Sequence, residues 1–237
     1  MKKISIIIPT YNNEDSIYLL CYKLLNISNI LLKKKINTEI IFVDDGSLDN
    51  SFFKLIKIKK DNKNIKIIKL AKNYGSQSAI LIGLKKAKGD AVCVITADLE
   101  DNPDLILNMA NKWISGERFI IYSRYKKEIS FSSIYHFLVK KIINEKYPLG
   151  GFDVFLLDKK YFKFLNFNEK NPIIALMLIS IKENPIILKY KKNKRLYGES
   201  QWTFKKKIIH IFNSFYYYYL KNIFKINNKN NLKFTIH

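Results

Sequence analysis

Short apolar runs and longer amphipathic segments alternate along the first half of the chain. The run Ile4–Ile8 is apolar apart from Ser5, which is typical of a strand buried on both faces. The same signal predicts further strands at residues 39–43, 64–70, 91–95 and 119–123. Helical spacing predicts helices between them, at residues 14–32, 49–58, 76–87 and 103–113. This alternation indicates an α/β fold built on a mainly parallel sheet.

The second half of the chain is less regular. Residues 126–147 are basic and amphipathic, and Gly150 and Gly151 follow them. The pattern then predicts a strand at 152–157, a helix at 171–181, a strand at 186–190, a loop at 191–201 and an amphipathic helix at 202–224. The tail from Asn227 is polar, and we expect it to be frayed. We predict one domain over residues 1–202, with an amphipathic helix and polar tail over residues 203–237.

Membrane-spanning and targeting patterns are not evident. The first apolar run ends at Pro9 and is too short for the apolar part of a signal peptide. The longest apolar candidate, residues 208–224, is interrupted by His210, Asn213 and Lys221, whereas a spanning helix needs roughly 18 apolar residues. We therefore expect a cytoplasmic protein that does not cross a membrane.

Composition adds a large positive charge to this picture. The chain has 237 residues, of which 48% are hydrophobic, and this excludes global disorder. It carries 42 Lys and Arg against 20 Asp and Glu, a net charge of +22 that could indicate a nucleic-acid partner. The lysines are dispersed, however, and their excess alongside Ile and Asn is typical of AT-rich coding DNA. No nucleic-acid motif is present, so we predict no nucleic-acid partner.

Arginine is rare in this lysine-rich chain. It occurs only at Arg118, Arg124 and Arg195. A retained arginine suggests a contact that needs a planar guanidinium fork, such as a phosphate.

Polar side chains collect where the expected strands end. Asp44 and Asp45 follow the second strand, Asp98 and Glu100 follow the fourth, and Arg124 follows the fifth. In open α/β sheets, ligands bind beyond the carboxyl ends of the strands. Neighbouring carboxylates repel one another unless a cation, ribose hydroxyls or base N–H groups satisfy them. A single carboxylate in such a place can instead cap a helix, but the cluster indicates a ligand site.

Several common cofactor motifs are missing. The sequence has no Gly-x-Gly-x-x-Gly fingerprint, no P-loop and no Gly-x-Ser-x-Gly nucleophile elbow. Its histidines are scattered and show no zinc spacing. The oxygen ligands that remain suit Mg²⁺ or Mn²⁺ bridging a diphosphate.

Several motifs in order resemble family 2 glycosyltransferases. They are IIIPTYNNE (6–14), VDDGSLD (43–49), NYGSQSA (73–79), GLKKAKGDAV (83–92) and ADLEDNP (97–103). Two later segments, GGFDVFLLD (150–158) and RLYGESQW (195–202), resemble the branch of polyprenyl-phosphate sugar transferases. The resemblance covers nearly the whole chain.

This resemblance implies a GT-A fold, a Rossmann-like three-layer sandwich with a mainly parallel mixed sheet. It implies inverting transfer of a sugar from a nucleotide-sugar donor to a polyprenyl-phosphate, lipid-linked or glycan acceptor. The implied donor-binding residues are Pro9, Tyr11, Glu14, Asp44, Asp45, Asn73, Gly75, Thr96, Ala97 and Asp98. The implied ligands of Mg²⁺ or Mn²⁺ are Asp98 and Glu100.

The resemblance also assigns the acceptor side of the site. The implied acceptor or phosphate contacts are Arg124, Arg195, Ser200, Gln201 and Trp202. Asp153 and Arg195 are the implied catalytic residues, with Asp153 as the base for a hydroxyl acceptor. A phosphate acceptor would need no base. The alternative for Asp153 is a structural carboxylate that bonds the Gly150-Gly151 turn.

Two departures leave alternatives open. Thr96 stands at the first acidic position of the family's Asp-x-Asp motif, and Glu100 takes a place usually held by Gln. The chain could therefore be a catalytically decayed nucleotide-binding relative that acts as a partner or scaffold. The helix at 202–224 carries apolar residues at helical spacing, with lysines alongside. Such a face could lie on an anionic inner membrane leaflet, or pack against the protein's own core or a twin subunit in a homodimer.

Overall fold

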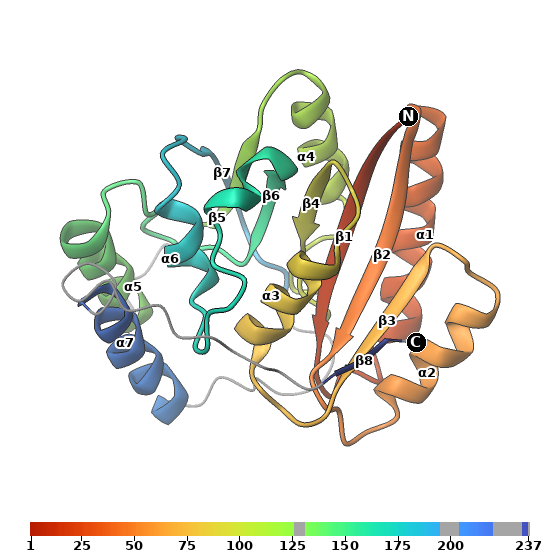
Figure 1. Cartoon of the computed structure of the whole chain (residues 1–237), viewed down its shortest axis with the longest axis horizontal. Helices are drawn as coiled ribbons and strands as arrows, with labels where there is room; N and C mark the ends of the chain where they lie inside the picture. The colour runs from red at the N-terminus through yellow and green to blue at the C-terminus, as the bar shows by residue number, and fades with distance from the viewer. Residues whose placement is uncertain (126–130, 195–203, 220–233, 237) are drawn as a thin grey trace.

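The computed structural model describes residues 1–125, 131–194, 204–219 and 234–236. Its centre is a mixed sheet with the strand order β7-β5-β6-β4-β1-β2-β3-β8 (Figure 1). The strands are β1 (Lys2–Thr10), β2 (Ile36–Asp44), β3 (Ile65–Leu70), β4 (Ala91–Val94), β5 (Phe119–Arg124), β6 (Val154–Asp158), β7 (Ile186–Tyr190) and β8 (Phe234–Ile236). The α-helices are α1 (Ile17–Lys33), α2 (Ser51–Lys60), α3 (Ser76–Lys86), α4 (Leu105–Ile114), α5 (Phe131–Leu138), α6 (Ile174–Ile179) and α7 (Phe204–Tyr219). A π-helical turn (Val139–Ile143) follows α5, and a 3₁₀ helix (Lys159–Phe164) follows β6.

Strand direction brings many chain segments to one edge of the sheet. β1 is parallel to β2 and β4, β2 is parallel to β3, and β5 is parallel to β7. β6 lies between β4 and β5 and is antiparallel to both. The carboxyl ends of β1 to β5 and β7 therefore share an edge with the amino end of β6. We call this the carboxyl edge of the sheet.

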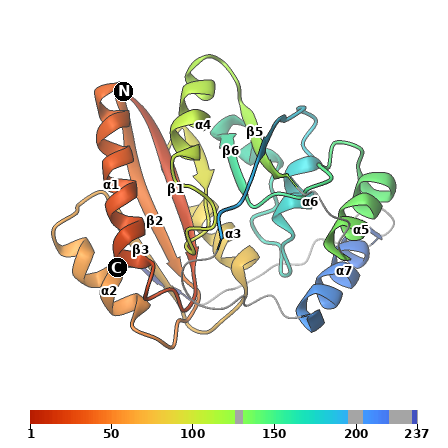
Figure 2. The same ribbon diagram turned by 180° about the vertical axis from the view of Figure 1, so that it is seen from behind.

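Alternate residues of the central strands face two separate cores. Ile6 and Phe42 pack in a cluster with residues of α1, α2 and α4. Ile7 and Val43 pack in the other cluster, with α3 and α6. A Cβ added at Gly83 would overlap the Ile7 side chain, so this glycine lets α3 approach β1 closely. Helices thus cover both faces of the sheet, which confirms the predicted three-layer α/β arrangement (Figures 1 and 2).

The strands and helices predicted for the first half are all present, with their ends shifted by a few residues. Within the basic, amphipathic stretch 126–147, the structure describes residues 131–147, and it places α5 and the π-helical turn there. There, α5 ends at Leu138, the π-helical turn ends at Ile143, and the chain then leaves helical geometry. The Asn144 amide donates a hydrogen bond back to the Val139 carbonyl, which is the wide i to i+5 closure of a π turn.

The C-terminal helix packs beside α5. Both views show α5 and α7 side by side, away from the strands β1 to β3 (Figures 1 and 2). The Tyr135 hydroxyl of α5 lies 2.8 Å from Ser214 Oγ of α7, and both side chains are buried. Ile211 of α7 packs against the core cluster that contains α3. One face of α7 therefore packs on the protein itself.

The frayed tail that the sequence predicts is wrong at residues 234–236. These residues form β8, which pairs antiparallel with β3 through Ile236 opposite Ile68 and Phe234 opposite Leu70. β3 would otherwise present an unpaired row of N–H and C=O groups, and such edges favour pairing with any available strand.

The buried carboxylate of Glu39 stabilises the middle of β2. Glu39 is 2% exposed. It accepts hydrogen bonds from Ser5 Oγ, the Lys88 amide and the Lys66 ammonium. Burial alone would raise the pKa of Glu39, but the hydrogen bonds from Lys66, Ser5 and Lys88 outweigh burial and lower the pKa to about 2.

The lowered pKa of Glu39 predicts that the folded state loses stability in acid. Because the folded-state pKa of Glu39 lies below its ordinary 4.5, its contribution to stability is complete above about pH 4.5 and is lost as the pH falls through about 2. We expect that loss to be about 3 kcal/mol. Urea unfolding between pH 2.5 and 6 should show a shallower pH dependence for Glu39→Gln than for wild type. Glu145→Gln, at an exposed site, is the control and should match wild type. Equal slopes for wild type and Glu39→Gln would contradict this role.

Candidate active site

The turns after β1 and β2 are joined to each other at the carboxyl edge. The Asn12 side-chain oxygen accepts a hydrogen bond from the Leu48 amide at 2.9 Å, and the Asn12 amide donates to Ser47 Oγ at 3.1 Å. The Asn13 amide donates to Ser51 Oγ at 2.8 Å. Asn12 has a φ of +50°, a left-handed conformation that asparagine tolerates better than most residues. The two turns therefore form one rigid border of the site.

The predicted donor residues of the first strand lie along this border. Pro9 is half-buried within the end of β1, and Tyr11 is half-buried in the turn that follows. Glu14 Oε2 lies 3.5 Å from Lys54 Nζ and accepts a hydrogen bond from the Asn50 amide. The Glu14 carboxylate is thus engaged with the start of α2.

Asp45 fastens the loop after β3 to the end of β2. Its two carboxylate oxygens accept hydrogen bonds from the Tyr74 amide at 2.7 Å and the Gly75 amide at 2.8 Å. Burial raises the pKa of Asp45 to about 6, against the opposing effect of these two amides. Gly46 has a φ of +71°, and a Cβ there would collide with the backbone of Lys72. The structure brings the predicted residues Asp45, Asn73 and Gly75 together, and it gives Asp45 a role in holding the loop.

Asp44 differs from its neighbour. It has no exposed surface, and neither of its carboxylate oxygens has a hydrogen-bond partner among the described residues. Burial raises the pKa of Asp44, while Ser47 and Lys69 act in the opposite direction; Ser47 stays outside normal hydrogen-bonding geometry. Such a buried acceptor is rare in folded proteins, and it fits a ligand that brings N–H or O–H donors.

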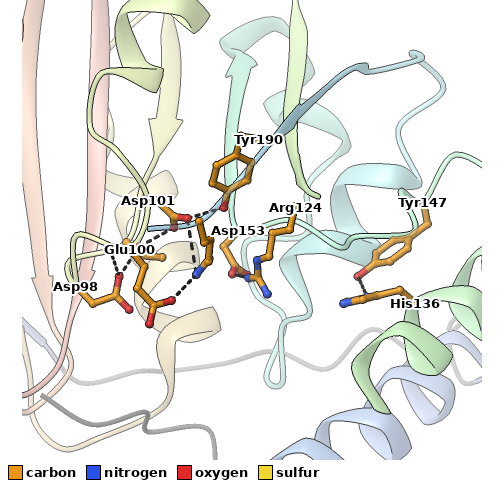
Figure 3. Close-up of polar contacts among 10 residues, drawn as sticks. Asp98, Glu100, Asp101, Arg124, His136, Tyr147, Asp153 and Tyr190 are labelled. Carbon is orange, nitrogen blue, oxygen red and sulfur yellow. Dashed lines mark hydrogen bonds and ion pairs between the residues drawn. The ribbon is translucent and has the colours of Figure 1, made fainter. Parts of the chain in front are cut away.

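The loop after β4 concentrates carboxylates around one hydroxyl. Thr96 Oγ1 lies 2.9 Å from Asp98 Oδ1 and 2.7 Å from Asp101 Oδ2. A hydroxyl carries one proton, so Thr96 donates to one carboxylate at a time. The Tyr190 hydroxyl donates to the other oxygen of Asp101 at 2.5 Å (Figure 3). Thr96 and Tyr190 together satisfy the fully buried Asp101.

The backbone of this loop is tightly constrained. The Ala97 carbonyl, another predicted site position, accepts a hydrogen bond from Ser16 Oγ at 2.8 Å. Leu99 has a φ of +59°, an unfavourable conformation for a leucine, and its side chain is buried in the core that contains α1 and α4. Packing of the Leu99 side chain therefore holds the turn that carries Asp98 and Glu100.

Glu100 is paired with a lysine that the sequence did not single out. Lys192 Nζ lies 3.0 Å from Glu100 Oε2 and 3.7 Å from Asp101 Oδ1. The Asn193 amide donates to the Glu100 carbonyl at 2.8 Å. The segment after β7 is therefore attached to the loop after β4.

Arg124 and Asp153 form an ion pair at the same edge (Figure 3). Arg124 ends β5, and Asp153 directly precedes β6, its antiparallel neighbour. A Cβ at Gly150 would overlap the Arg124 carbonyl oxygen, so the glycine turn lies directly against the end of β5. The two residues were predicted in separate roles, as a phosphate contact and a catalytic base, and the structure places them in direct contact.

His136, which is paired with Tyr147, packs against the Gly150-Gly151 turn. His136 Nδ1 lies 3.1 Å from the Tyr147 hydroxyl, and the two rings are stacked with centroids 5.6 Å apart (Figure 3). Gly151 has a φ of +61°, and a Cβ there would overlap the His136 ring. Sequence reasoning did not predict His136, Tyr147, Tyr190 or Lys192 as neighbours of the site. For Tyr190 a signal exists, because parallel pairing of β5 and β7 places it opposite Arg124.

Four predicted residues lie outside the described residues: Arg195, Ser200, Gln201 and Trp202. None of the helices within the described part of the chain is long and apolar enough to span a membrane.

A match to a family model identifies the family of this chain. The model described as Glycosyl transferase family 2 matches residues 5–226. The chain belongs to this family. It is 32% identical over 209 residues to the uncharacterized glycosyltransferase YkcC of Bacillus subtilis (strain 168), covering 85% of this chain and 64% of the relative. It is 28% identical over 211 residues to the uncharacterized glycosyltransferase sll0501 of Synechocystis sp., covering 86% and 65%. The chain thus spans less than two thirds of the length of these curated relatives.

Solved structures of two sugar-phosphoglycerate synthases share the fold. Mannosyl-3-phosphoglycerate synthase from Rubrobacter xylanophilus superposes with a TM-score of 0.61 at 14% identity, covering 97% of this chain and 77% of that one. Glucosyl-3-phosphoglycerate synthase from Mycobacterium tuberculosis, in complex with Mn²⁺, UDP and phosphoglyceric acid, gives 0.59 at 14% identity, covering 93% and 78%. These matches confirm the predicted GT-A fold.

The contacts of Thr96 predict what an acidic residue at this position would do to stability. Thr96→Asp would put a third carboxylate against Asp98 and Asp101 and remove the donor between them. We expect it to lower the free energy of unfolding by about 1.5–3 kcal/mol, as for lost hydrogen bonds to charged groups. Urea unfolding measures the change, with Thr96→Ser as the hydroxyl-retaining control. Unchanged stability in Thr96→Asp would show that the hydroxyl does not hold these carboxylates.

Proposed function

We propose that this protein is an inverting glycosyltransferase that moves a sugar from a nucleotide-sugar donor to a polyprenyl-phosphate or other lipid-linked acceptor. One arrangement carries the proposal: Asp98 after β4 and the Arg124–Asp153 pair between β5 and β6 lie at the same edge of the sheet (Figure 3). An acidic group and a phosphate-binding fork at one edge suit a substrate that carries a diphosphate. Membership of the family supports the same reaction class.

The donor side of the site would lie over the ends of β1, β2 and β3. Asp44 supplies a buried acceptor that has no partner among the described residues. The turns at residues 11–14, 46–49 and 73–75 border it. A structural neighbour, the glucosyl-3-phosphoglycerate synthase, was solved with UDP, which supports a nucleotide donor here.

Asp98 is the residue that best fits a divalent cation. Its half-buried carboxylate lies at a strand end, and a hard oxygen ligand suits Mg²⁺ or Mn²⁺. When bound, the cation would neutralise charge on the donor diphosphate as the sugar leaves. Mn²⁺ is present in the glucosyl-3-phosphoglycerate synthase structure, which supports this choice of metal class. Within the described residues, no group of three or more His, Cys, Asp or Glu side chains could hold a metal ion.

The remaining roles follow from charge. The Arg124 guanidinium would bind a phosphate where negative charge grows during the transfer. Asp153 is ion-paired with Arg124 at this edge, and a carboxylate placed there can accept the proton of a hydroxyl acceptor. A phosphate acceptor would bring its own nucleophilic oxygen, and Asp153 would then orient it. Arg195, Ser200, Gln201 and Trp202 keep their proposed roles at the acceptor or diphosphate.

The alternative of a catalytically decayed relative has less support. Thr96 occupies its place with two short contacts to carboxylates, and Asp101 is held by a second hydroxyl. This network gives Thr96 a structural role, and membership of a glycosyltransferase family favours an active enzyme over the decayed alternative.

A surface on α5 and α7 supports contact with a membrane. Among the described residues, α5, the π turn and α7 together expose seven large apolar side chains: Ile134, Phe137, Ile142, Ile209, Phe212, Tyr216 and Tyr219. The π turn adds the exposed Lys140 and Lys141. Apolar side chains beside lysines suit the surface of an anionic leaflet. We propose that the protein is cytoplasmic and binds peripherally at the inner face of the membrane, with a homodimer contact as the alternative use of this surface.

Donor turnover tests the proposed activity. Purified protein with Mn²⁺, polyprenyl phosphate and a panel of nucleotide sugars should release a nucleoside diphosphate with at least one donor, and mass spectrometry should identify a glycosylated lipid. Asp98→Asn should lower this rate by about 100-fold or more, because it removes charge stabilisation in the transition state. Asp104→Asn, at an exposed position six residues later, is the control and should keep the wild-type rate. No release with any donor, or full activity in Asp98→Asn, would exclude the proposal.

Vesicle binding tests the membrane contact. Phe212 is 71% exposed on α7, and Phe53 is 69% exposed on α2. We expect Phe212→Glu to weaken binding to anionic phospholipid vesicles about tenfold, because burial of a Phe side chain contributes about 1.5–3 kcal/mol. Phe53→Glu makes the same chemical change away from the surface and should have no effect. If Phe212→Glu instead converts a dimer to monomers without changing vesicle binding, the surface is a subunit interface.

A further inference from the structure

The segment after β7 is fastened to the loop after β4 across about ninety positions of sequence. The Tyr190 hydroxyl donates to Asp101, and the Lys192 ammonium donates to Glu100 Oε2 at 3.0 Å. The Asn193 amide donates to the Glu100 carbonyl at 2.8 Å. Three contacts from one short segment therefore reach the loop that carries Asp98, and Figure 3 shows the contact between Tyr190 and Asp101.

Lys192 is the cation of this contact. Its side chain is 22% exposed and that of Glu100 is 18% exposed, so water screens the pair only in part. Lys192 Nζ is also 3.7 Å from Asp101, which has no exposed side-chain surface. The loop holds three carboxylates within four positions, Asp98, Glu100 and Asp101, and the ammonium lies beside two of them.

We propose that Lys192 is a positioning residue that withholds Glu100 from the divalent cation, so that Asp98 is the acidic metal ligand of the loop. This inference rests on the proposed function. A divalent cation and the Lys192 ammonium would compete for the same carboxylate, because both are positive and both need its oxygens. Ligation by Glu100 would break the ion pair and leave the ammonium next to a second positive charge.

This role also links the metal site to the rest of the chain. Lys192 lies two positions after the end of β7 and three positions before Arg195, the proposed phosphate contact. While Glu100 is held by Lys192 and by the Asn193 amide, the segment after β7 keeps a fixed position on the Asp98 loop. Lys192 thus acts on the reaction through Glu100 and the backbone, without contacting the reacting atoms.

A simple structural role makes a different prediction. If Lys192 only stabilised the fold, its removal would lower stability and leave metal affinity unchanged or weaker. If it withholds Glu100, its removal releases a carboxylate beside Asp98, and metal affinity rises. The sign of the change in metal affinity therefore separates the two roles.

The experiment measures Mn²⁺ binding to the full chain without donor, by electron paramagnetic resonance of free Mn²⁺. Lys192→Gln should tighten binding about two- to fivefold, the range that corresponds to a partly screened ion pair. Glu100→Gln alone leaves the Lys192 ammonium unpaired near the cation and should weaken binding by charge repulsion. The double variant Glu100→Gln/Lys192→Gln removes both charges of the pair and should bind Mn²⁺ as wild type does, because Glu100 is not a ligand in the wild type. Lys191→Gln removes the same charge from an exposed neighbour and is the matched control.

Two results would overturn the inference. The first is weaker Mn²⁺ binding in the double variant Glu100→Gln/Lys192→Gln than in wild type, since Glu100 would then be a ligand in the wild type. This arm leaves no unpaired charge, so it decides the question even if Lys192→Gln alone does not fold, which thermal unfolding would reveal. The second is an equal gain in Lys191→Gln and Lys192→Gln, since net charge alone would then explain the effect.

Asp98→Asn separates this inference from the proposed function. Loss of Mn²⁺ binding in Asp98→Asn together with weaker binding in the double variant Glu100→Gln/Lys192→Gln overturns the inference and leaves the proposed metal site intact. Unchanged binding in Asp98→Asn contradicts the metal site itself, and the inference falls with it. If neither wild type nor Lys192→Gln binds Mn²⁺, the inference is likewise overturned.

Discussion

The reversed direction of β6 is the constraint on which the site depends. In an all-parallel sheet, the residues that precede a strand lie at the opposite edge from those that follow its neighbours. Because β6 is antiparallel to β4 and β5, Asp153 before β6 meets Arg124 after β5 on the side where Asp98 follows β4. The Gly150-Gly151 turn makes this reversal possible, since no Cβ fits against the end of β5 or the His136 ring. The site is therefore assembled by topology before any ligand is present.

Within the site, three carboxylates are each satisfied by a different kind of partner, and this divides their roles from that of Asp44. Backbone amides hold Asp45, hydroxyls hold Asp101, and the Lys192 ammonium holds Glu100. These groups maintain the shape of the loops. Asp44, in contrast, is buried with no hydrogen-bond partner among the described residues, and burial raises its pKa. The free energy of leaving Asp44 unsatisfied is offset by the rest of the fold, which is typical of a group that a ligand completes.

The sequence predicted the first half of the fold well because its strands are buried on both faces. Continuous apolar runs such as Ile4–Ile8 can satisfy that environment only as central strands, so the period of the pattern decides the element. Strand direction has no such signature, and the run at 152–157 reads the same in either direction. The amphipathic spacing at 126–147 does not show where a helix ends, because it continues past the π turn that follows α5. β8 was missed because three residues next to a polar tail carry too little pattern, and only the open edge of β3 defines it.

The site was predicted in its members but not in its contacts. Motif order brought Asp98, Arg124 and Asp153 into consideration, whereas the Arg124–Asp153 pair and the Lys192–Glu100 pair join segments far apart in sequence. Lysine is abundant in this chain, so its frequency gave no reason to expect a specific role for Lys192. Only the three arginines are rare enough to stand out. Residue frequency was therefore a poor guide to the role of the arginines as well as of the lysines. The rare Arg118 pairs with Asp158 at the opposite edge of the sheet, at 3.4 Å, whereas Lys192, one among many lysines, is partly shielded beside the loop after β4. What gives a cation a specific role is the exclusion of water around its partner, which residue frequency does not measure and tertiary packing alone decides.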